Sequence, residues 1–132
     1  MERIDTLLLV DDDKIFQYLT QKIIETTNLV NKIKIFSNGF EAIAFLSTYS
    51  DKPELLPDII LLDLNMPIMD GWQFLEEYVR IKPNIAKQIT IYILTSSIDP
   101  ADIKKSEEIS EVSDFIIKPI TKDKFINLLK SL

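Results

Sequence analysis

The stretch Asp58–Gly71, DIILLDLNMPIMDG, predicts a buried strand that ends on a carboxylate. Its apolar run, Ile59–Leu62, is short and bounded by turn-forming residues, which is typical of a strand covered on both faces in a parallel sheet. Asp63 directly follows the run. Ligands of open α/β sheets bind outside the carboxyl ends of the strands. Asp63 is therefore a candidate for exposed, reactive chemistry, although an Asp at this point can also simply cap a turn.

Length and composition restrict the chemistry that this chain can carry. Its 132 residues, 46% of them hydrophobic, predict one globular domain with a full core. The sequence contains no Cys and no His, which excludes disulfides, zinc sites of the usual kind, Cys or Ser–His nucleophiles and His general bases. Any reaction must therefore use carboxylates, hydroxyls, Lys or a hard metal ion.

Charge and hydropathy exclude two classes of partner. The net charge of −6 argues against nucleic acid, because affinity for phosphates depends on Lys and Arg. The charged segment Met1–Asp5 does not resemble a signal peptide. The longest uninterrupted apolar run, Ala42–Leu46, is five residues long, too short to span a membrane. We therefore expect a cytoplasmic protein with neither a nucleic-acid nor a membrane partner.

The rest of the chain alternates strand and helix patterns. Apolar or alternating runs predict four further strands, at 6–10, 32–36, 89–94 and 114–117, and the alternation in Lys32–Phe36 is typical of a sheet edge. Helices are predicted from Lys14, over 40–46, over 72–81, over 99–109 and from Thr121. Five successive β–α units predict a parallel sheet with right-handed crossovers and helices on both faces.

Periodicity also predicts which face of each helix meets the core. The predicted core positions are Phe16, Leu19, Ile23 and Ile24 in the first helix, Phe40, Ile43 and Ala44 in the second, Phe74, Leu75, Tyr78 and Val79 in the third, and Phe125, Leu128 and Leu129 in the last. The helix predicted over 99–109 is mostly polar. It is interpreted either as a solvated helix or as a mobile, partner-binding one.

Polar side chains follow four of the five predicted strands. Asp11 and Asp12 follow the first strand, Asp63 the third, Thr95 the fourth and Lys118 the fifth. Parallel strands of this fold bring these ends to one edge of the sheet. Two carboxylates about 4 Å apart repel by roughly 4 kcal/mol at an effective dielectric constant of about 20. Three acids at one edge therefore require a counter-charge.

Lys118 can supply part of that counter-charge, and a divalent cation can supply the rest. An all-oxygen cluster favours Mg²⁺ or Ca²⁺, and few ligands with room for water favour Mg²⁺. An Asp can attack phosphorus and form an acyl phosphate, a reaction that needs charge neutralisation more than proton transfer. Asp13, the third acid of the run, is interpreted as the cap of the following helix.

Four motifs in this order resemble a known family. They are LVDD at 9–12, LLDLNMPIMDG at 61–71, ILTS at 93–96 and IIKP at 116–119. Together they resemble the response-regulator receiver domain of two-component signalling, with the chemotaxis-regulator type of fold, over about residues 5–131. The resemblance implies an α/β, flavodoxin-like, five-stranded parallel sheet of order 2-1-3-4-5 with helices on both faces. It also implies one receiver domain over residues 1–132 without an output domain.

The resemblance assigns the acidic residues to a phosphoacceptor site that binds Mg²⁺. Asp63 resembles the phosphoacceptor, Asp12 the direct metal ligand and Asp11 its water-mediated partner. The backbone carbonyl of Asn65 would be a further protein contact to the metal.

Other positions resemble the family's catalytic, switch and lifetime residues. Lys118 would pair with the phosphoryl group, with a cis peptide bond to Pro119, and Thr95 would donate to a phosphoryl oxygen. Phe115 occupies the position of the aromatic switch residue. It lacks the hydroxyl of a Tyr, and a permanently buried ring remains the alternative. Asn65 and Ser97 occupy the positions that tune acyl-phosphate lifetime, and both are small and neutral, so the lifetime is left open.

The implied function is a stand-alone receiver and not an enzyme, apart from its own phosphorylation and dephosphorylation. A histidine kinase or phosphotransfer protein would phosphorylate Asp63, and the change would alter a surface over residues 95–132 that binds a downstream protein. The chain would be a monomer or a weak homodimer through its fourth helix, fifth strand and fifth helix. The sequence names neither the kinase nor the target.

Three alternatives stay open at this point. A Mg²⁺-dependent phosphatase of the haloacid-dehalogenase type needs a second Asp two residues after the nucleophile, where this chain has Asn65. A flavodoxin-like electron carrier needs a phosphate cradle after the first strand, where 11–13 would repel a phosphate. A receiver that binds its partner without phosphorylation keeps the fold and loses the chemistry.

Overall fold

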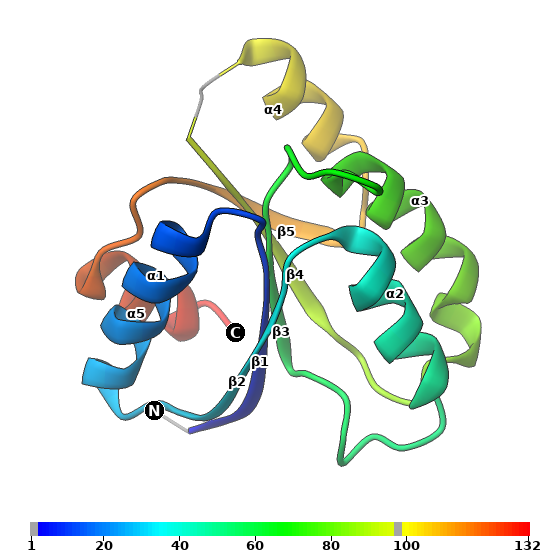
Figure 1. The fold of residues 1–132 in the computed structure, drawn as a ribbon, viewed down its shortest axis with the longest axis horizontal. Coiled ribbons are helices and arrows are strands. Elements are labelled where there is room, and N and C mark those ends of the chain that lie inside the picture. Colours follow the sequence, from blue (N-terminus) through cyan, green and yellow to red (C-terminus); the bar gives the residue numbers. More distant parts are fainter. Residues whose placement is uncertain (1–2, 97–98) are drawn as a thin grey trace.

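The computed structural model describes residues 3–96 and 99–132, and its centre is a parallel sheet. The strand order is β2-β1-β3-β4-β5, which confirms the predicted topology (Figure 1). The strands are β1 (Ile4–Val10), β2 (Val30–Phe36), β3 (Ile59–Leu62), β4 (Thr90–Thr95) and β5 (Val112–Ile117).

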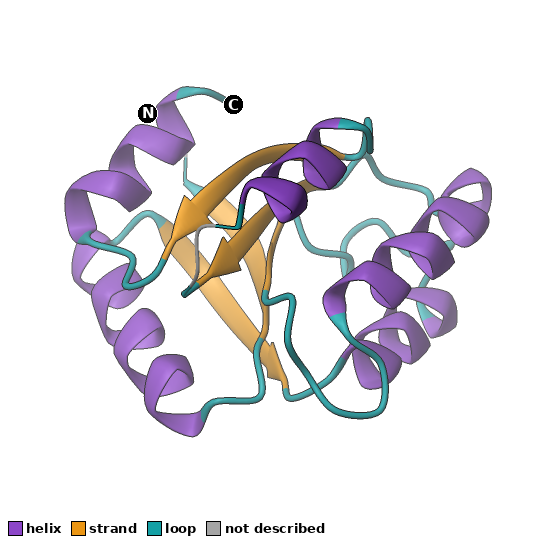
Figure 2. Cartoon of the chain, turned by 90° about the horizontal axis from the view of Figure 1, so that it is seen from above, coloured by secondary structure: helices purple, strands orange, loops and turns teal. Residues whose placement is uncertain are grey.

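Helices cover both faces of the sheet. Figure 1 shows one pair, α1 (Lys14–Thr27) and α5 (Lys122–Lys130), on one face and a second pair, α2 (Gly39–Thr48) and α3 (Gly71–Ile81), on the other. A 3₁₀ turn, η1 (Lys82–Asn84), follows α3. The remaining helix, α4 (Pro100–Glu107), packs beside β5 (Figure 2). Within the described residues, no helix has both the length and the apolar character needed to cross a membrane.

Each α-helix is preceded by a residue whose side chain accepts a hydrogen bond from a backbone N–H of the first turn. These caps are Asp13, Asn38, Asp70, Asp99 and Thr121. The structure therefore confirms that Asp13 starts the first helix, with its carboxylate accepting from the N–H groups of Ile15 and Phe16. Such caps occupy donors that the helix itself leaves unbonded.

The sheet separates two hydrophobic cores because side chains alternate along each strand. One core contains Leu7, Leu9, Ile59 and Leu61 together with residues of α1 and α5. The other contains Leu8, Val10, Ile60 and Leu62 together with residues of α2 and α3. All four residues of β3 are fully buried, whereas β2 at the edge is only partly buried. The central strand is thus covered on both faces, as the opening motif predicts.

The predicted core face of α1 is partly wrong. Its fully packed residues are Gln17, Thr20 and Ile24, and Leu19 is 47% exposed. The buried face is rotated toward Gln17 because this side chain donates hydrogen bonds to the backbone oxygen of Asp11 and to Ser37 Oγ. A polar residue is stable at a buried position when its hydrogen bonds are made.

The face of α2 is also shifted from the predicted one. Phe40 is 58% exposed and Ala44 is exposed, whereas Gly39, Ala42 and Leu46 are buried. Contact with the loop that follows β3 sets this orientation. The Gly39 N–H donates to the Met69 carbonyl at 3.0 Å, and a Cβ at Gly39 would lie 2.9 Å from that same oxygen.

The predictions for α3 and α5 are more successful. Phe125, Leu128 and Leu129 of α5 are buried, as predicted. In α3 the predicted Phe74, Leu75 and Tyr78 are buried, whereas Val79 is 45% exposed.

Contacts with α3 and η1 hold the polar helix α4 and the loop behind it. Only Ser106 is buried in α4. Lys105 Nζ lies 4.6 Å from the centre of the Trp72 ring, and Glu111, in the loop after α4, pairs with Lys82 at 3.1 Å. The helix therefore depends on charged contacts more than on apolar packing.

Candidate functional site

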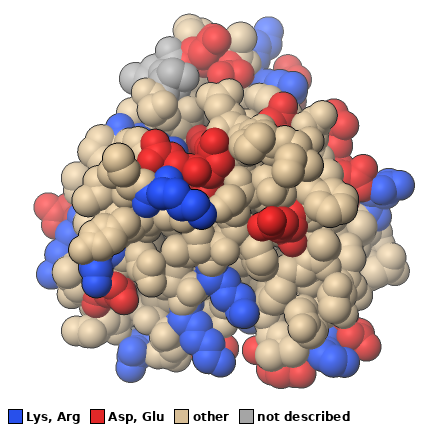
Figure 3. Space-filling view, in the orientation of Figure 1, with Lys and Arg blue, Asp and Glu red and all other residues tan. Residues whose placement is uncertain are grey.

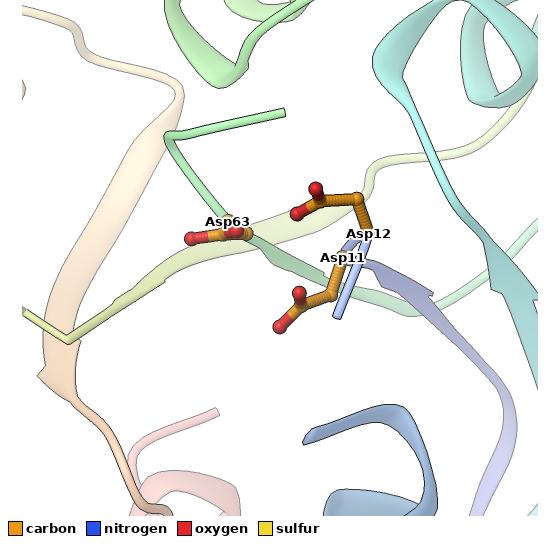
Figure 4. Close-up of side chains that lie close together, drawn as sticks. All are labelled: Asp11, Asp12 and Asp63. Carbon is orange, nitrogen blue, oxygen red and sulfur yellow. The ribbon is translucent and has the colours of Figure 1, made fainter. Parts of the chain in front are cut away.

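Three carboxylates meet at the carboxyl edge of the sheet. Asp11 and Asp12 follow β1, and Asp63 follows its neighbour β3, where the Asp63 N–H donates to the Val10 carbonyl at 2.9 Å. One oxygen of each of the three lies within 4.8 Å of the others (Figure 4). Asp11 and Asp63 are buried, at 1% and 6% exposure, and Asp12 is exposed. The cluster is thus closed on one side and open to solvent on the other.

Lys118 brings a buried ammonium to the carboxylates from β5. Its Nζ lies 2.6 Å from Asp11 Oδ2 and 3.6 Å from Asp63 Oδ1, and its side chain is 5% exposed. Pairing of its backbone N–H with the Thr95 carbonyl at 2.6 Å fixes the end of β5 against β4. The peptide bond from Lys118 to Pro119 is cis.

Burial makes ionised Asp63 costly. It raises the pKa of the Asp63 carboxyl to about 6, against the pull of the Lys118 ammonium, which lowers this pKa. The Asp11 carboxylate raises the pKa further, and the backbone N–H groups of Leu64 and Asn65 lower it. At neutral pH the carboxylate is therefore mostly ionised and available as a nucleophile, in a site where its charge is poorly balanced.

The donor set fits a hard divalent cation such as Mg²⁺. Three carboxylates face a single ammonium, so the described cluster keeps a net negative charge. All the side-chain donors are oxygen, and the exposure of Asp12 leaves room for metal-bound water. Mg²⁺ in proteins is held in this manner, by one or two carboxylates together with water and phosphate oxygens.

Gly71 determines the path of the loop that carries Asp63. Its N–H donates to the Leu64 carbonyl at 2.9 Å, and α3 begins here with a capping box between Asp70 and Gln73. A Cβ at Gly71 would lie 2.6 Å from the Asp63 carbonyl oxygen and 2.8 Å from the Leu64 Cα. Only glycine allows this approach, so Gly71 helps to position the loop segment that carries the Asp63 carboxylate.

The first turn of α1 supports the other side of the site. The Asp13 N–H donates to Asp11 Oδ1 at 2.9 Å, while Gln17 Nε2 donates to the Asp11 carbonyl. The Phe16 ring lies under the Lys118 ammonium, with 4.3 Å from Nζ to the ring centre. Neither supporting role was predicted from the sequence, in which Phe16 is predicted only as a core residue of the first helix and Gln17 has no predicted role.

The remaining predicted residues lie near the site or around it. Thr95 is buried at the end of β4, directly beside Lys118 in the backbone pairing. Phe115 in β5 is half-buried and packs against the core on the α2–α3 side. Asn65 is exposed in the loop after Asp63. Ser97 lies outside the described residues.

Comparison with known proteins gives consistent matches. Residues 7–130 match the response regulator receiver domain family. Response regulator Rcp1 of Synechocystis sp. is 35% identical over 106 residues, which cover 78% of this chain and 69% of Rcp1. A two component response regulator from Cytophaga hutchinsonii superposes with a TM-score of 0.89 at 32% identity, covering 98% of this chain and 97% of that one.

Two further matched structures describe ligand or modification states of similar proteins. The Mn²⁺-bound form of Rcp1 has a TM-score of 0.75 at 32% identity, over 96% of this chain and 90% of that one. The phosphorylated cyanobacterial phytochrome response regulator RcpA has a TM-score of 0.75 at 29% identity, over 96% of this chain and 89% of that one.

Proposed function

This chain belongs to the response regulator receiver domain family, and from that premise we propose that it accepts a phosphoryl group on Asp63 in a Mg²⁺-dependent reaction. The donor is a histidine kinase or a phosphotransfer protein. One observation carries the proposal: the clustered oxygens of Asp11, Asp12 and Asp63, with the buried ammonium of Lys118 against them. The Mn²⁺-bound and phosphorylated states of similar regulators support it.

In the proposed reaction an Asp63 carboxylate oxygen attacks the phosphorus of the donor. A new O–P bond forms and the donor's P–N bond breaks, with the electron pair remaining on the imidazole, which takes its proton from solvent. Asp63 needs no general base, because its pKa of about 6 leaves it ionised at neutral pH. Lys118 stabilises the charge on the phosphoryl oxygens, and Thr95 donates a hydrogen bond to one of them.

A bound Mg²⁺ would supply positive charge to offset the negative charge on the phosphoryl oxygens. Asp11, Asp12 and Asp63 would hold it together with the backbone carbonyl of Asn65. A general acid two residues after the nucleophile is lacking, because Asn65 cannot donate a proton as an Asp would. This disfavours turnover of phosphate esters and favours a signalling role.

Phosphorylation is proposed to change the surface over residues 95–132. Half-buried Phe115 borders a cavity of about 560 Å³ between α4 and β5, which gives its ring space to move. Few apolar contacts hold α4, so movement of the Thr95 loop can alter its position. Asn65 and Ser97 tune the acyl-phosphate lifetime. We further propose that the receiver acts in the cytoplasm on a downstream protein, as a monomer or a weak homodimer through α4, β5 and α5.

The test uses Trp72, which directly follows Gly71. Mg²⁺ and then beryllofluoride or acetyl phosphate are titrated while Trp72 fluorescence and intact mass are followed, with Asp63→Asn as the control. A saturable Mg²⁺ response and a phosphate adduct that requires Asp63 are the expected results. No adduct by mass in the unaltered protein would overturn the proposal and favour a receiver that binds its partner unphosphorylated. Hydrolysis of phosphate esters with repeated turnover would favour the phosphatase.

A further inference from the structure

We infer that Phe16 is a positioning residue for Lys118, whose ammonium it holds at the acidic cluster by a cation–π contact. The inference rests on the proposed function for its consequence in phosphoryl transfer, and on geometry alone for the contact itself. The Phe16 ring centre lies 4.3 Å from Lys118 Nζ. Both side chains are shielded, with Lys118 5% exposed and Phe16 half-buried.

Four contacts form a closed ring of interactions through Asp11, Asp13, Phe16 and Lys118. Asp11 Oδ1 accepts from the Asp13 N–H at 2.9 Å, and Asp13 Oδ1 accepts from the Phe16 N–H at 3.2 Å. The Phe16 ring then meets Lys118 Nζ, which returns to Asp11 Oδ2 at 2.6 Å. The Asp13 cap therefore holds the backbone of Phe16 in place, and the Phe16 ring in turn holds the Lys118 ammonium close to the Asp11 carboxylate.

The Phe16 contact allows the Lys118 ammonium to remain buried while it moves between the carboxylates of Asp11 and Asp63. Its pairing with Asp11 is short and that with Asp63 is longer, at 3.6 Å. A phosphoryl group on Asp63 would attract the Lys118 ammonium, and a cation on Asp11 would compete with it, so either would separate Lys118 from its present closest partner. The ring bears no charge and competes for neither ligand. It can hold the ammonium through such an exchange, because the negative face of an aromatic ring attracts a cation without requiring a fixed direction.

Loss of a cation–π contact of a desolvated ammonium should lower the fraction of molecules in which Lys118 Nζ lies at the acidic cluster by about two- to thirtyfold, and the rate should fall with that fraction. Phe16→Leu should therefore slow phosphorylation by acetyl phosphate by that factor, and Phe16→Tyr should restore most of it. The matched control is Tyr18→Leu. Tyr18 is 57% exposed on the same helix, and its ring makes its own contact with Lys22, 5.5 Å from Nζ to the ring centre. This control should leave the rate unchanged.

A graded series separates ring electrostatics from packing. Phe16 is replaced by phenylalanines with one, two and three ring fluorines, which weaken the negative face with little change in size. A stepwise fall of the logarithm of the rate with each fluorine supports the inference. Equal rates across the series, with a slow Phe16→Leu variant, would show that the ring acts by packing alone and would overturn it.

A second measurement does not depend on phosphorylation. In NMR spectra of the full chain, the ε-methylene protons of Lys118 should be shifted upfield by the Phe16 ring current. The shift should vanish in Phe16→Leu and persist in Phe16→Tyr. Its absence from the unaltered protein would overturn the inference. If the unaltered protein takes no phosphate at all, the proposed function fails, and this spectrum still decides whether Phe16 positions Lys118.

Discussion

Asp63→Asn should stabilise the fold in the absence of divalent cations, although it removes the proposed phosphoacceptor. The cause is the buried, poorly balanced charge at the carboxyl edge of the sheet. Asp63 is 6% exposed, and its carboxyl has a pKa of about 6, against 3.8 for the ordinary group. The ionised form is thus less favourable in the folded state than in the unfolded one.

The magnitude follows from the pKa difference. At 1.36 kcal/mol per pKa unit, a rise from 3.8 to about 6 corresponds to about 3 kcal/mol. Because the folded pKa of Asp63 is raised, its protonated form favours the fold fully below the unfolded pKa. This contribution is lost as the pH rises through about 6. The variant should therefore exceed the wild type by only about 0.5 kcal/mol near pH 4 and by up to about 3 kcal/mol near pH 7.5.

Urea denaturation in the presence of a chelator, from about pH 4 to 8, measures the difference. Asp51→Asn serves as the control, because the Asp51 side chain is 78% exposed, and we expect it to change stability by less than about 0.5 kcal/mol. Adding Mg²⁺ should narrow the difference, since a cation held by three carboxylates stabilises only the wild-type fold by mass action. A variant no more stable than the wild type near pH 7.5 would refute the argument that Asp63 is ionised at a cost.

Three further predictions concern the framework of the site. Gly71→Ala should destabilise the fold by about 1–3 kcal/mol in urea and weaken the Mg²⁺ response, because the new Cβ would lie 2.6 Å from a loop carbonyl oxygen; an unchanged midpoint would contradict this. Ile24→Ala should cost about 2–5 kcal/mol and Leu19→Ala far less, since Ile24 is fully buried and Leu19 is 47% exposed; equal losses would contradict the observed helix face. Asp58 pairs with Lys87 at 2.7 Å. Burial alone would raise the pKa of Asp58, but this pairing and hydrogen bonds from backbone N–H groups lower it. Asp58→Asn should therefore destabilise the fold at neutral pH, with a loss that fades as the pH falls through the folded pKa; a pH-independent loss would argue against the ion pair.

Strand positions and most site residues were predictable because their signals are local. A fully apolar run such as Ile59–Leu62 marks a strand buried on both faces, and a parallel sheet places the residue after it at the ligand-binding edge. Because Asp63 directly follows this run, its place at the carboxyl edge of the sheet could be predicted. Helix faces were less predictable, since a helix can bury any stripe that its neighbours cover. In α1, the buried stripe passes through Gln17 and not through Leu19.

The order of the elements, the lack of Cys and His and most of the polar residues at the carboxyl ends of the strands can be read from the amino-acid sequence. The way in which those residues meet depends on the packed fold. In the folded chain Lys118 lies closer to Asp11 than to Asp63, the Phe16 ring lies beneath the ammonium, and Gly71 packs against the loop that carries Asp63. The contacts of Lys118 join residues far apart in the chain, and the approach of Gly71 depends on the path of the loop between Asp63 and α3. Their distances depend on how the helices pack on the sheet, which periodicity along one segment does not encode.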